Sequence, residues 1–359
     1  MRYFCAIFLV LGFSFSTDSS LFAEANNQCF EDCDKCSSVA GEDDDSEYFD
    51  YDDGSYGGCC NFGYNIDCSQ EQLYLTPYGY GDPCDCGATC DPCWYKHGIL
   101  MPQCKTLFPQ FMADPRAINM SVGWRFNDSV FDKNVIDVSY GQPFPIWRWF
   151  NVFCCGDAME IDLEGALWAI FEPLDDSAPL VNADYYVGFP LTWACGRWSW
   201  RLRGYHISSH IGDEYLIEHP GFDRRNPSAQ YLDFFLAYQL TEAMRIYWGY
   251  GRIFMVDASF PVKRNYFEWG VETYFPYFNW DGYQYCVLGR PFYAMHFRFR
   301  EDDNYREDAT YVLGYELYKM TGLGGKLRGF LEYHKGASLE GQFCRFQTDY
   351  LSFRLSYGY

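Results

Sequence analysis

The stretch Leu351-Ser-Phe-Arg-Leu-Ser-Tyr-Gly-Tyr359 decides the fold, because its residues alternate between two chemical characters without a break. Leucine, phenylalanine and tyrosine stand at every second position, and serine, arginine and glycine stand between them. Successive side chains of a β-strand point to opposite faces. The stretch is therefore predicted to be a strand with one face suited to hydrocarbon and the other suited to water, as in the wall of a membrane-spanning barrel.

Twelve strand candidates, this one included, follow one another from about Asn119 onward. They cover residues 119–126, 135–141, 158–171, 180–193, 197–207, 230–240, 244–254, 266–275, 291–300, 310–319, 326–334 and 346–359. Tilted strands need roughly 9–11 residues to cross a bilayer, and the candidates have about that length. The sequence predicts an all-β fold, namely a transmembrane antiparallel up-and-down β-barrel of about 12 strands, preceded by a Cys-rich and largely irregular segment.

The connections between these candidates provide an independent test. In an even-stranded barrel with both ends in the periplasm, even-numbered connections are short and odd-numbered ones long. The even-numbered connections 194–196 and 241–243 are short, and the odd-numbered connection 208–229 is long and polar. Connections 142–157 and 276–290 are even-numbered but long, so they do not fit the pattern.

Residues 1–25 are predicted to be a signal peptide. Met1-Arg2 is positively charged, Tyr3 to Phe15 is an apolar run, and Ala23-Glu24-Ala25 offers small residues for cleavage. Aromatic residues make up 21% of the chain, which fits the aromatic girdles of outer-membrane barrels. We expect the bacterial cell outer membrane as the location and outer-membrane lipid as a partner. Because the chain has no basic stripe, nucleic acid is not expected as a partner.

Residues 26–104 differ from the barrel region 105–359 in charge and in cysteine content. They hold 16 Asp and Glu residues against two Lys, and 11 of the 17 cysteines. The spacings Cys29-x3-Cys33-x2-Cys36 and Cys86-x3-Cys90-x2-Cys93 admit an iron–sulfur cluster. Disulfides are favoured, because exported Cys-dense segments with little core are usually held by them. We expect no metal and no cofactor, and an acidic periplasmic extension that contacts periplasmic partners, including disulfide-linked envelope proteins.

Three motifs of the barrel region carry a family resemblance. They are Leu107-Phe-Pro-Gln-Phe-Met-Ala-Asp-Pro-Arg116, Val181-Asn-Ala-Asp-Tyr-Tyr-Val-Gly-Phe-Pro190 and Tyr205-His-Ile-Ser-Ser-His-Ile-Gly-Asp-Glu214, and Gly341-Gln342 with Asp349-Tyr350 adds a fourth. Over roughly residues 105–359 the chain resembles an uncharacterised family of predicted bacterial outer-membrane proteins, labelled only as a domain of unknown function. The resemblance implies a barrel and supplies no activity.

Charged residues on the polar strand faces are predicted to line the lumen. They are Arg125, Glu160, Asp162, Glu164, Arg201, Arg203, Arg245, Glu268, Glu272, Arg298, Arg300, Glu316, Arg328 and Glu332. In an open pore they would set ion preference, whereas in a filled barrel they would pair with one another. Twelve strands fall between filled small barrels and open 16-stranded porins, so the sequence leaves both alternatives open. A structural envelope protein or a narrow channel is the expected function.

The alternative function is hydrolysis of a lipid or lipid A acyl ester. His206, Ser208 and His210 share one strand face if the strand continues, and that face is predicted to meet lipid. Ser208 would be the nucleophile and His206 the base, with Asp213 or Glu214 orienting the imidazole. The spacing is similar to that of outer-membrane phospholipase A and lipid A deacylase, which use a His and a Ser two residues apart. The neighbouring sequence matches neither enzyme.

Overall fold

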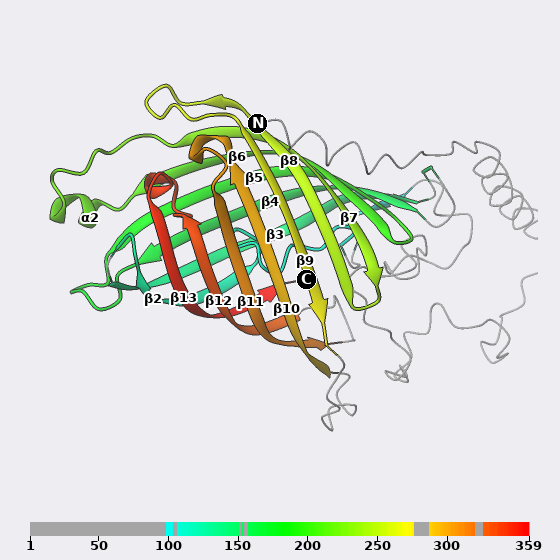
Figure 1. The fold of residues 1–359 in the computed structure, drawn as a ribbon. Helices are drawn as coiled ribbons and strands as arrows, with labels where there is room; N and C mark the ends of the chain where they lie inside the picture. Colours follow the sequence, from blue (N-terminus) through cyan, green and yellow to red (C-terminus); the bar gives the residue numbers. More distant parts are fainter. Residues whose placement is uncertain are drawn as a thin grey trace, which may run out of the picture.

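The computed structural model describes residues 98–102, 106–131, 133–150, 152–153, 157–275, 287–319 and 326–358. Twelve antiparallel strands, β2 to β13, pair in sequence order, and β13 pairs with β2 to close the barrel. Figure 1 shows the strands as a tilted, curved wall. The predicted twelve-stranded up-and-down barrel is confirmed. Most of the Cys-rich extension, the predicted signal peptide and Tyr359 lie outside the described residues.

The strands differ in length, and the longest extend past their neighbours at one end of the barrel. Their bounds are β2 (Met120–Asp128), β3 (Lys133–Phe150), β4 (Ala158–Phe171), β5 (Leu180–Cys195), β6 (Trp198–Ile211), β7 (Ser228–Thr241), β8 (Met244–Val256), β9 (Asn265–Tyr274), β10 (Val287–Arg300), β11 (Glu307–Lys319), β12 (Lys326–Ala337) and β13 (Gln347–Gly358). The short helical elements are α2 (Asp213–Glu218), η4 (Glu301–Asp303) and η5 (Gly341–Phe343). No helix in the described part of the chain is long and apolar enough to cross a bilayer.

The two ends of the barrel have different connections. We call the end with residues 212–227 and 338–346 the loop end, and the end with residues 196–197 and 242–243 the turn end. The turn after β5 has only two residues, and Gly196 takes a positive φ of 54° there, which suits a tight hairpin. The connections that did not fit the length pattern also lie at the turn end.

One of those connections is shorter than the sequence pattern indicated. The predicted strand 135–141 continues as β3 to Phe150, so the connection to β4 shrinks to 151–157. Pro143 and Pro145 obscured this continuation, because proline is uncommon inside strands, and a bulge follows Pro145. The extra strand β1 (Ile99–Leu100) pairs with the extended part of β3 at Trp147 and Arg148. It adds part of the predicted extension to the sheet.

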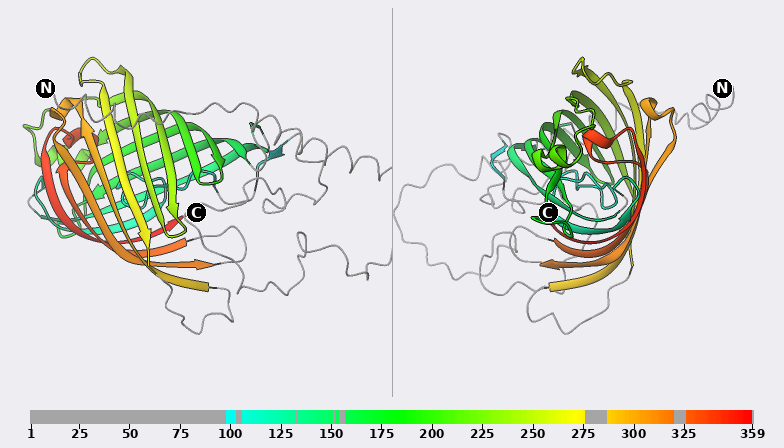
Figure 2. Two further views of the ribbon diagram at one scale, coloured as in Figure 1. Left: turned by 45° about the vertical axis from the view of Figure 1, so that its right-hand side comes forward. Right: turned by 90° about the vertical axis from the view of Figure 1, so that its left-hand side faces the viewer.

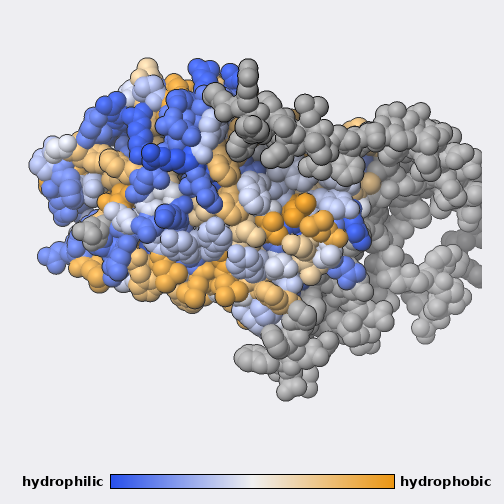
Figure 3. All heavy atoms as spheres, viewed as in Figure 1, coloured by the Kyte–Doolittle hydropathy of each residue, from blue (hydrophilic) through white to orange (hydrophobic). Residues whose placement is uncertain are grey.

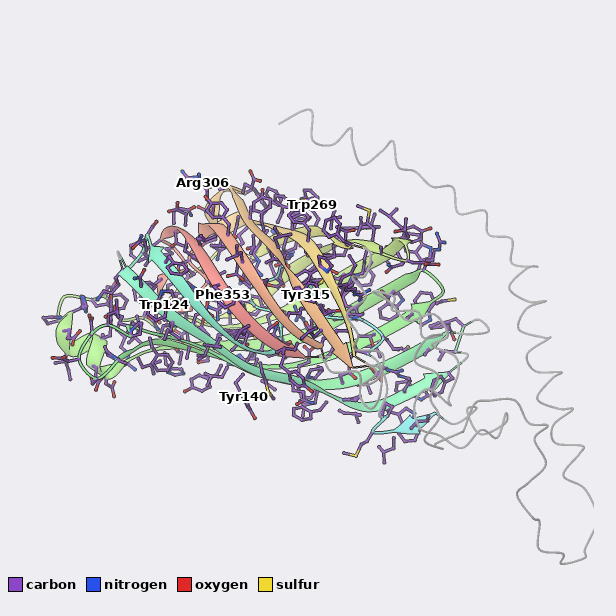
Figure 4. All side chains as sticks on the ribbon, turned by 90° about the horizontal axis from the view of Figure 1, so that it is seen from below. Trp124, Tyr140, Trp269, Arg306, Tyr315 and Phe353 are labelled. Atoms are coloured by element: carbon purple, nitrogen blue, oxygen red, sulfur yellow. The ribbon has the colours of Figure 1, made fainter. Side chains whose placement is uncertain are left out.

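The outer wall is apolar and the inner wall is polar. In β13, Leu351, Phe353, Leu355 and Tyr357 are 45–48% exposed, while the residues between them are buried in the interior. Trp269, Tyr315 and Phe353 project outward from the wall in Figure 4. Hydrophobic residues spread along the wall in Figure 3, while the loop end around α2 is mostly hydrophilic. A soluble protein does not leave so many large apolar side chains exposed.

The interior contains a stretch of chain that precedes the first barrel strand. Residues 106–119, which we call the lumen segment, have no regular secondary structure, and many of their apolar side chains are almost fully buried. Figure 2 shows this part of the chain inside the curve of the wall. The first family motif, Leu107 to Arg116, therefore lies in the lumen rather than in the wall. The sequence pattern had placed it only within the barrel region.

Candidate functional site: the occupied lumen

The apolar side chains of the lumen segment pack against walls on several sides. Leu107 contacts Phe150, Ala158 and Ala194 of β3 to β5. Met112 and Ala113 belong to a cluster on β9 to β12 that contains Phe292 and Phe330, and Ile118 packs with Trp168 and Tyr186 of β4 and β5. Contacts with strands all around the barrel indicate that the segment crosses the middle of the lumen.

Phe111 is the most tightly packed aromatic residue of the segment. Its ring stacks on Tyr247 of β8, with centroids 3.7 Å apart and planes 9° apart. Phe108 lies edge-on to Phe111 at 5.5 Å, and Phe235 of β7 lies 5.2 Å from it. The edge-on contact with Phe108 and the tilted contact with Phe235 add about 0.5–1.5 kcal/mol per pair beyond the burial of apolar area.

Backbone groups of the segment bond to charged side chains of the wall. The Met112 N–H donates to Oε1 of Glu272 at 2.6 Å. Arg245 forms an ion pair with the same carboxylate, Nη2 to Oε2 at 2.6 Å, and donates to the Pro109 carbonyl at 3.2 Å. The Arg245–Glu272 pair thus holds the irregular backbone of the segment, which has no strand partner for its polar groups.

The far end of the segment is held by an ion pair. Arg116 Nη2 lies 2.6 Å from Oδ2 of Asp184 on β5 and also donates to the Leu339 carbonyl. Closer to the middle, Gln110 donates to Glu164 at 3.2 Å, and Asp114 lies 3.7 Å from Arg298. The segment is therefore fixed to the wall by charge as well as by packing.

A loop from the loop end folds into the same region. Residues 338–346, which we call the lumen loop, place the Gly341 N–H 3.1 Å from Oδ2 of Asp184. The Gln342 amide donates to the Ser209 carbonyl at 3.1 Å, and Glu340 lies 2.9 Å from Nη2 of Arg125. Burial alone would raise the pKa of Glu340, but the guanidinium groups of Arg125 and Arg116 hold it below its usual value.

The four family motifs meet around Asp184. Asp184 comes from the second motif, Arg116 from the first and Gly341 from the fourth. Asn182 donates to Asp184 at 2.8 Å, and Ser209 of the third motif donates to Asn182 at 3.0 Å. Motifs that are far apart in the sequence thus form one hydrogen-bonded junction between the lumen segment, the lumen loop and the wall.

The family model described as "Protein of unknown function (DUF1207)" matches residues 84–359. The chain belongs to the DUF1207 family. The resemblance drawn from the motifs is confirmed, and the match begins about twenty residues before the barrel region that the motifs indicated.

Solved structures similar to this DUF1207 protein are outer-membrane barrels. Outer membrane phospholipase A from Escherichia coli has 10% sequence identity and a TM-score of 0.43, with 67% of this chain and 92% of that chain covered. The Salmonella typhi outer membrane phospholipase dimer with bound calcium has 9% identity and a TM-score of 0.44, with 67% and 89% covered. The NanC porin has 10% identity and a TM-score of 0.35, with 67% and 99% covered. No curated protein matches the chain.

The residues predicted to line the lumen of this DUF1207 protein all lie on the inner side of the wall. Most form ion pairs there, several with acidic or basic residues that the sequence analysis did not single out. The pairs are Arg125–Asp137, Arg148–Glu160, Arg203–Asp233, Arg245–Glu272, Arg290–Glu316, Arg298–Glu268, Arg300–Asp308, Arg328–Glu316 and Arg354–Glu332. Glu164 accepts a hydrogen bond from Tyr186 at 2.6 Å. This pairing is the arrangement expected of a filled barrel.

Two of these residues have polar atoms without a partner. Arg201 is 2% exposed, and among the described residues neither its Nε nor its Nη1 has a hydrogen-bond partner. Its guanidinium lies 4.9 Å from the Phe108 ring and 5.4 Å from the Phe111 ring, so it contacts the lumen segment through cation–π geometry. Oδ1 of Asp162 is also buried, and no described residue forms a hydrogen bond with it.

A cavity remains beside the lumen segment. It is small, because the space that a water-sized molecule can reach there is about 20 Å³. Phe111 and Met112 line it from the segment, and Arg328, Glu332 and Arg354 line it from β12 and β13. The cavity is polar on the wall side, and its arginines are already paired with Glu316 and Glu332.

The residues predicted for hydrolysis are only partly brought together. On the outer face of β6, Ser208 Oγ and His210 Nε2 form a hydrogen bond at 3.1 Å, so the serine bonds to His210 and not to the predicted base His206. Asp213 and Glu214 begin α2. Among the described residues, the only hydrogen bond of either carboxylate is the one that Ser177 donates to Glu214 at 3.4 Å. No described carboxylate orients the imidazole of His210.

A cluster of acidic side chains at the loop end forms ion pairs with a lysine. Glu172, Asp175 and Glu218 lie close enough together to share a metal ion. The Lys133 ammonium group lies 2.9 Å from both Glu172 and Asp175, so it already supplies the positive charge. Nothing in this arrangement calls for a metal.

Proposed function

We propose that this protein is an integral barrel of the bacterial outer membrane with a structural role in the envelope, and that its own chain closes the lumen. The observation that carries the proposal is the lumen segment, which packs against strands from β3 to β12 and bonds to Glu272, Asp184 and Glu164. The exposed apolar side chains of the outer wall support the membrane location. The inner wall is polar, and most of its charged side chains form ion pairs with one another.

The narrow-channel alternative requires the lumen segment to move. Removing it would break the Arg116–Asp184 ion pair and expose Phe111, Met112 and their apolar partners on the wall. This cost favours the closed state at rest. A conducting state would therefore appear as a rare event in the native protein rather than as its normal condition.

The barrel would also anchor the acidic extension. Because β1 and the lumen segment attach to the wall, residues 26–97 would emerge at the turn end, which is the periplasmic side in this proposal. The odd number of cysteines between Cys29 and Cys104 supports a disulfide to another cysteine of the chain or to another envelope protein. A non-reducing gel of intact cells tests this. A ladder that collapses with reductant is expected, and a single band under both conditions would contradict the cross-linking.

The proposal that the lumen is closed is tested by measuring the current through planar bilayers that contain the refolded full chain. The wild-type protein is expected to show almost no stable current. A variant in which residues 106–118 are replaced by a Gly/Ser stretch of equal length is expected to conduct, because a flexible polar chain does not pack in the lumen. Steady channels in the wild-type protein would refute the closed state. A non-conducting replacement variant that is correctly inserted would show that other elements close the lumen.

Hydrolysis of a lipid acyl ester is the second candidate, favoured by the hydrogen bond between Ser208 and His210. In this reaction Ser208 Oγ would attack the ester carbonyl carbon while His210 takes the hydroxyl proton and passes it to the alcohol that leaves. Water would then hydrolyse the acyl-serine ester and release the fatty acid. The test is release of fatty acid from phospholipid vesicles by the wild-type protein and by Ser208→Ala. Activity that disappears in the variant would support the candidate. Absence of activity in the inserted wild-type protein, with and without divalent cations, would exclude it.

A further inference from the structure

The outer face of β6 to β8 changes from apolar to polar near the loop end. Along β6 the outward residues are apolar as far as Leu202, and Gly204, His206 and Ser208 follow them. In the strand register, His206 lies opposite Gln230 of β7. Leu232, two residues further along β7, lies opposite Arg252 of β8. Polar side chains from three neighbouring strands therefore gather on the outward face near one end of the barrel.

Among the described residues, no hydrogen bond or ion pair involves the side chains of His206, Gln230 or Arg252. Arg252 is exposed, and among the described residues no carboxylate forms an ion pair with it. Its register neighbour Asn265 already accepts a hydrogen bond from Tyr250 at 2.7 Å and donates to Glu301 at 2.6 Å. An arginine on the lipid-facing surface is costly unless it lies near the interface and finds an anion there.

Gly204, which has no side chain, leaves an open position on the outward face beside this patch, and we call this position the hollow. Gly204 lies between Phe189 of β5 and Leu232 of β7 in the register. A methyl group in place of its hydrogen would meet only Cδ1 of Leu232, at 3.9 Å. Phe189 is 57% exposed and Leu232 is 37% exposed, so both flank the open space. The hollow has the apolar lining that an acyl chain would contact.

The other side of the barrel lacks such a patch at the corresponding height. Tyr333 lies four residues before the end of β12, as Arg252 does before the end of β8. Tyr333 pairs in the register with Tyr311 and Leu351, and Leu351 pairs with Phe126. This row is entirely apolar or aromatic. The row at Tyr333 thus lacks the polar side chains that β6–β8 present, and on this side of the barrel the charged residues Lys335 and Asp349 face each other closer to the strand ends.

We propose that His206, Gln230 and Arg252 bind the phosphate group of a lipid in the outer leaflet, with an acyl chain of the same lipid in the hollow at Gly204. Arginine binds phosphate with two parallel hydrogen bonds, and the imidazole and amide groups supply further donors. The inference rests on the proposed membrane location, because the patch faces lipid only in an inserted barrel. It does not depend on whether the lumen is closed, nor on hydrolysis by Ser208.

Native mass spectrometry of the refolded full chain in detergent micelles tests the site. The probes are phosphatidic acid and the diacylglycerol with the same acyl chains, which differ only in the phosphate. Wild-type protein is expected to retain phosphatidic acid about tenfold better. The double variant His206→Gln, Arg252→Gln is expected to lose this preference. Lys335→Gln, which removes another exposed cation of the outer wall on β12, is the matched control and should keep it.

Each outcome decides between the alternatives. Equal retention of the two lipids by the wild-type protein, or an equal loss in Lys335→Gln, would refute a specific phosphate site. Displacement by millimolar inorganic phosphate would identify a site for free phosphate instead of a lipid. Insertion of each protein into vesicles is checked first by its resistance to unfolding in unheated gel samples. A wild-type chain that never inserts would overturn the proposed function itself, and the lipid site with it.

Discussion

Phe111 of the lumen segment stacks face to face on Tyr247 of β8, with ring centroids 3.7 Å apart. This contact joins the irregular lumen segment to the barrel wall. Phe111→Ala is expected to lower the free energy of unfolding by about 3–5 kcal/mol, as buried Phe-to-Ala changes do. It should also loosen the segment, so the variant should show brief current steps in planar bilayers that the wild-type protein lacks.

Phe353→Ala is the matched control for this change. Phe353 is a phenylalanine of the outer wall and is 48% exposed. Its loss removes contact with lipid but leaves the lumen unchanged, so no current steps are expected. Equal conductance in both variants would mean that the steps come from general destabilisation of the barrel and not from movement of the segment.

Arg201 and Arg245 offer a second test, because both are buried beside the segment and, of the two, only Arg245 forms an ion pair with a described residue. Arg245→Met leaves Glu272 without its guanidinium partner, and we expect a loss of about 3–5 kcal/mol in unfolding free energy. Arg201→Met replaces an unpaired cation with an apolar side chain among phenylalanine rings. We expect a loss below about 1 kcal/mol, because the cation–π energy given up is offset by the removal of an unpaired buried charge.

Denaturant titration of the refolded barrels in vesicles measures both changes. Both arginines are almost fully buried. The essential result is therefore which of the two substitutions lowers the free energy of unfolding more. A larger loss for Arg201→Met than for Arg245→Met would show that Arg201 has a partner that the described residues do not include.

Glu340 makes the lumen loop sensitive to acid. The carboxylate lies 2.9 Å from Arg125, and its pKa is held below the usual value in the folded protein. A carboxyl group with a lowered folded-state pKa stabilises the fold above its unfolded-state pKa, and this stability disappears as the pH falls through the folded-state pKa. The wild-type protein should therefore lose stability below about pH 4.5, the usual pKa of a glutamate.

Glu340→Gln isolates this contribution. At neutral pH the variant should be about 2 kcal/mol less stable than the wild-type protein, because it lacks the charge that faces Arg125. The difference between the two proteins should shrink on acidification, since the wild-type carboxylate is then protonated. Denaturant midpoints at several pH values provide the measurement. A difference that stays constant down to pH 3 would show that the charge of Glu340 does not stabilise the loop.

The barrel wall was predictable from the sequence because each strand has its own alternation. Leu351 to Tyr357 presents exposed apolar side chains outward and buries the residues between them in the interior, and this local pattern needs no knowledge of distant residues. The extension of β3 to Phe150 was missed, since two prolines interrupt the pattern at 143 and 145. Pairing with β4 overrides that local signal.

The lumen segment was not predictable by the same method. Its residues neither alternate nor repeat at a helical period, and their contacts lie on strands far along the chain, such as Phe330 of β12. One signal was present: Leu107, Phe108, Phe111 and Met112 are too apolar for an exposed linker ahead of a membrane barrel. Likewise, the spacing of His206 and Ser208 indicated a shared face, but only the side-chain rotamers decide that Ser208 bonds to His210.

The last prediction tests the membrane location and concerns Leu331 in the middle of β12. Leu331 is 50% exposed on the outer wall, and its register neighbours are Leu313 and Phe353. Leu331→Arg should cost about 2–4 kcal/mol in vesicles, because a charged side chain near the bilayer midplane loses its hydration. Lys335→Arg, on the same face but close to the strand end, should cost almost nothing. If the two substitutions cost the same in vesicles, hydrocarbon does not cover this face, and the wall would have to meet water or another protein.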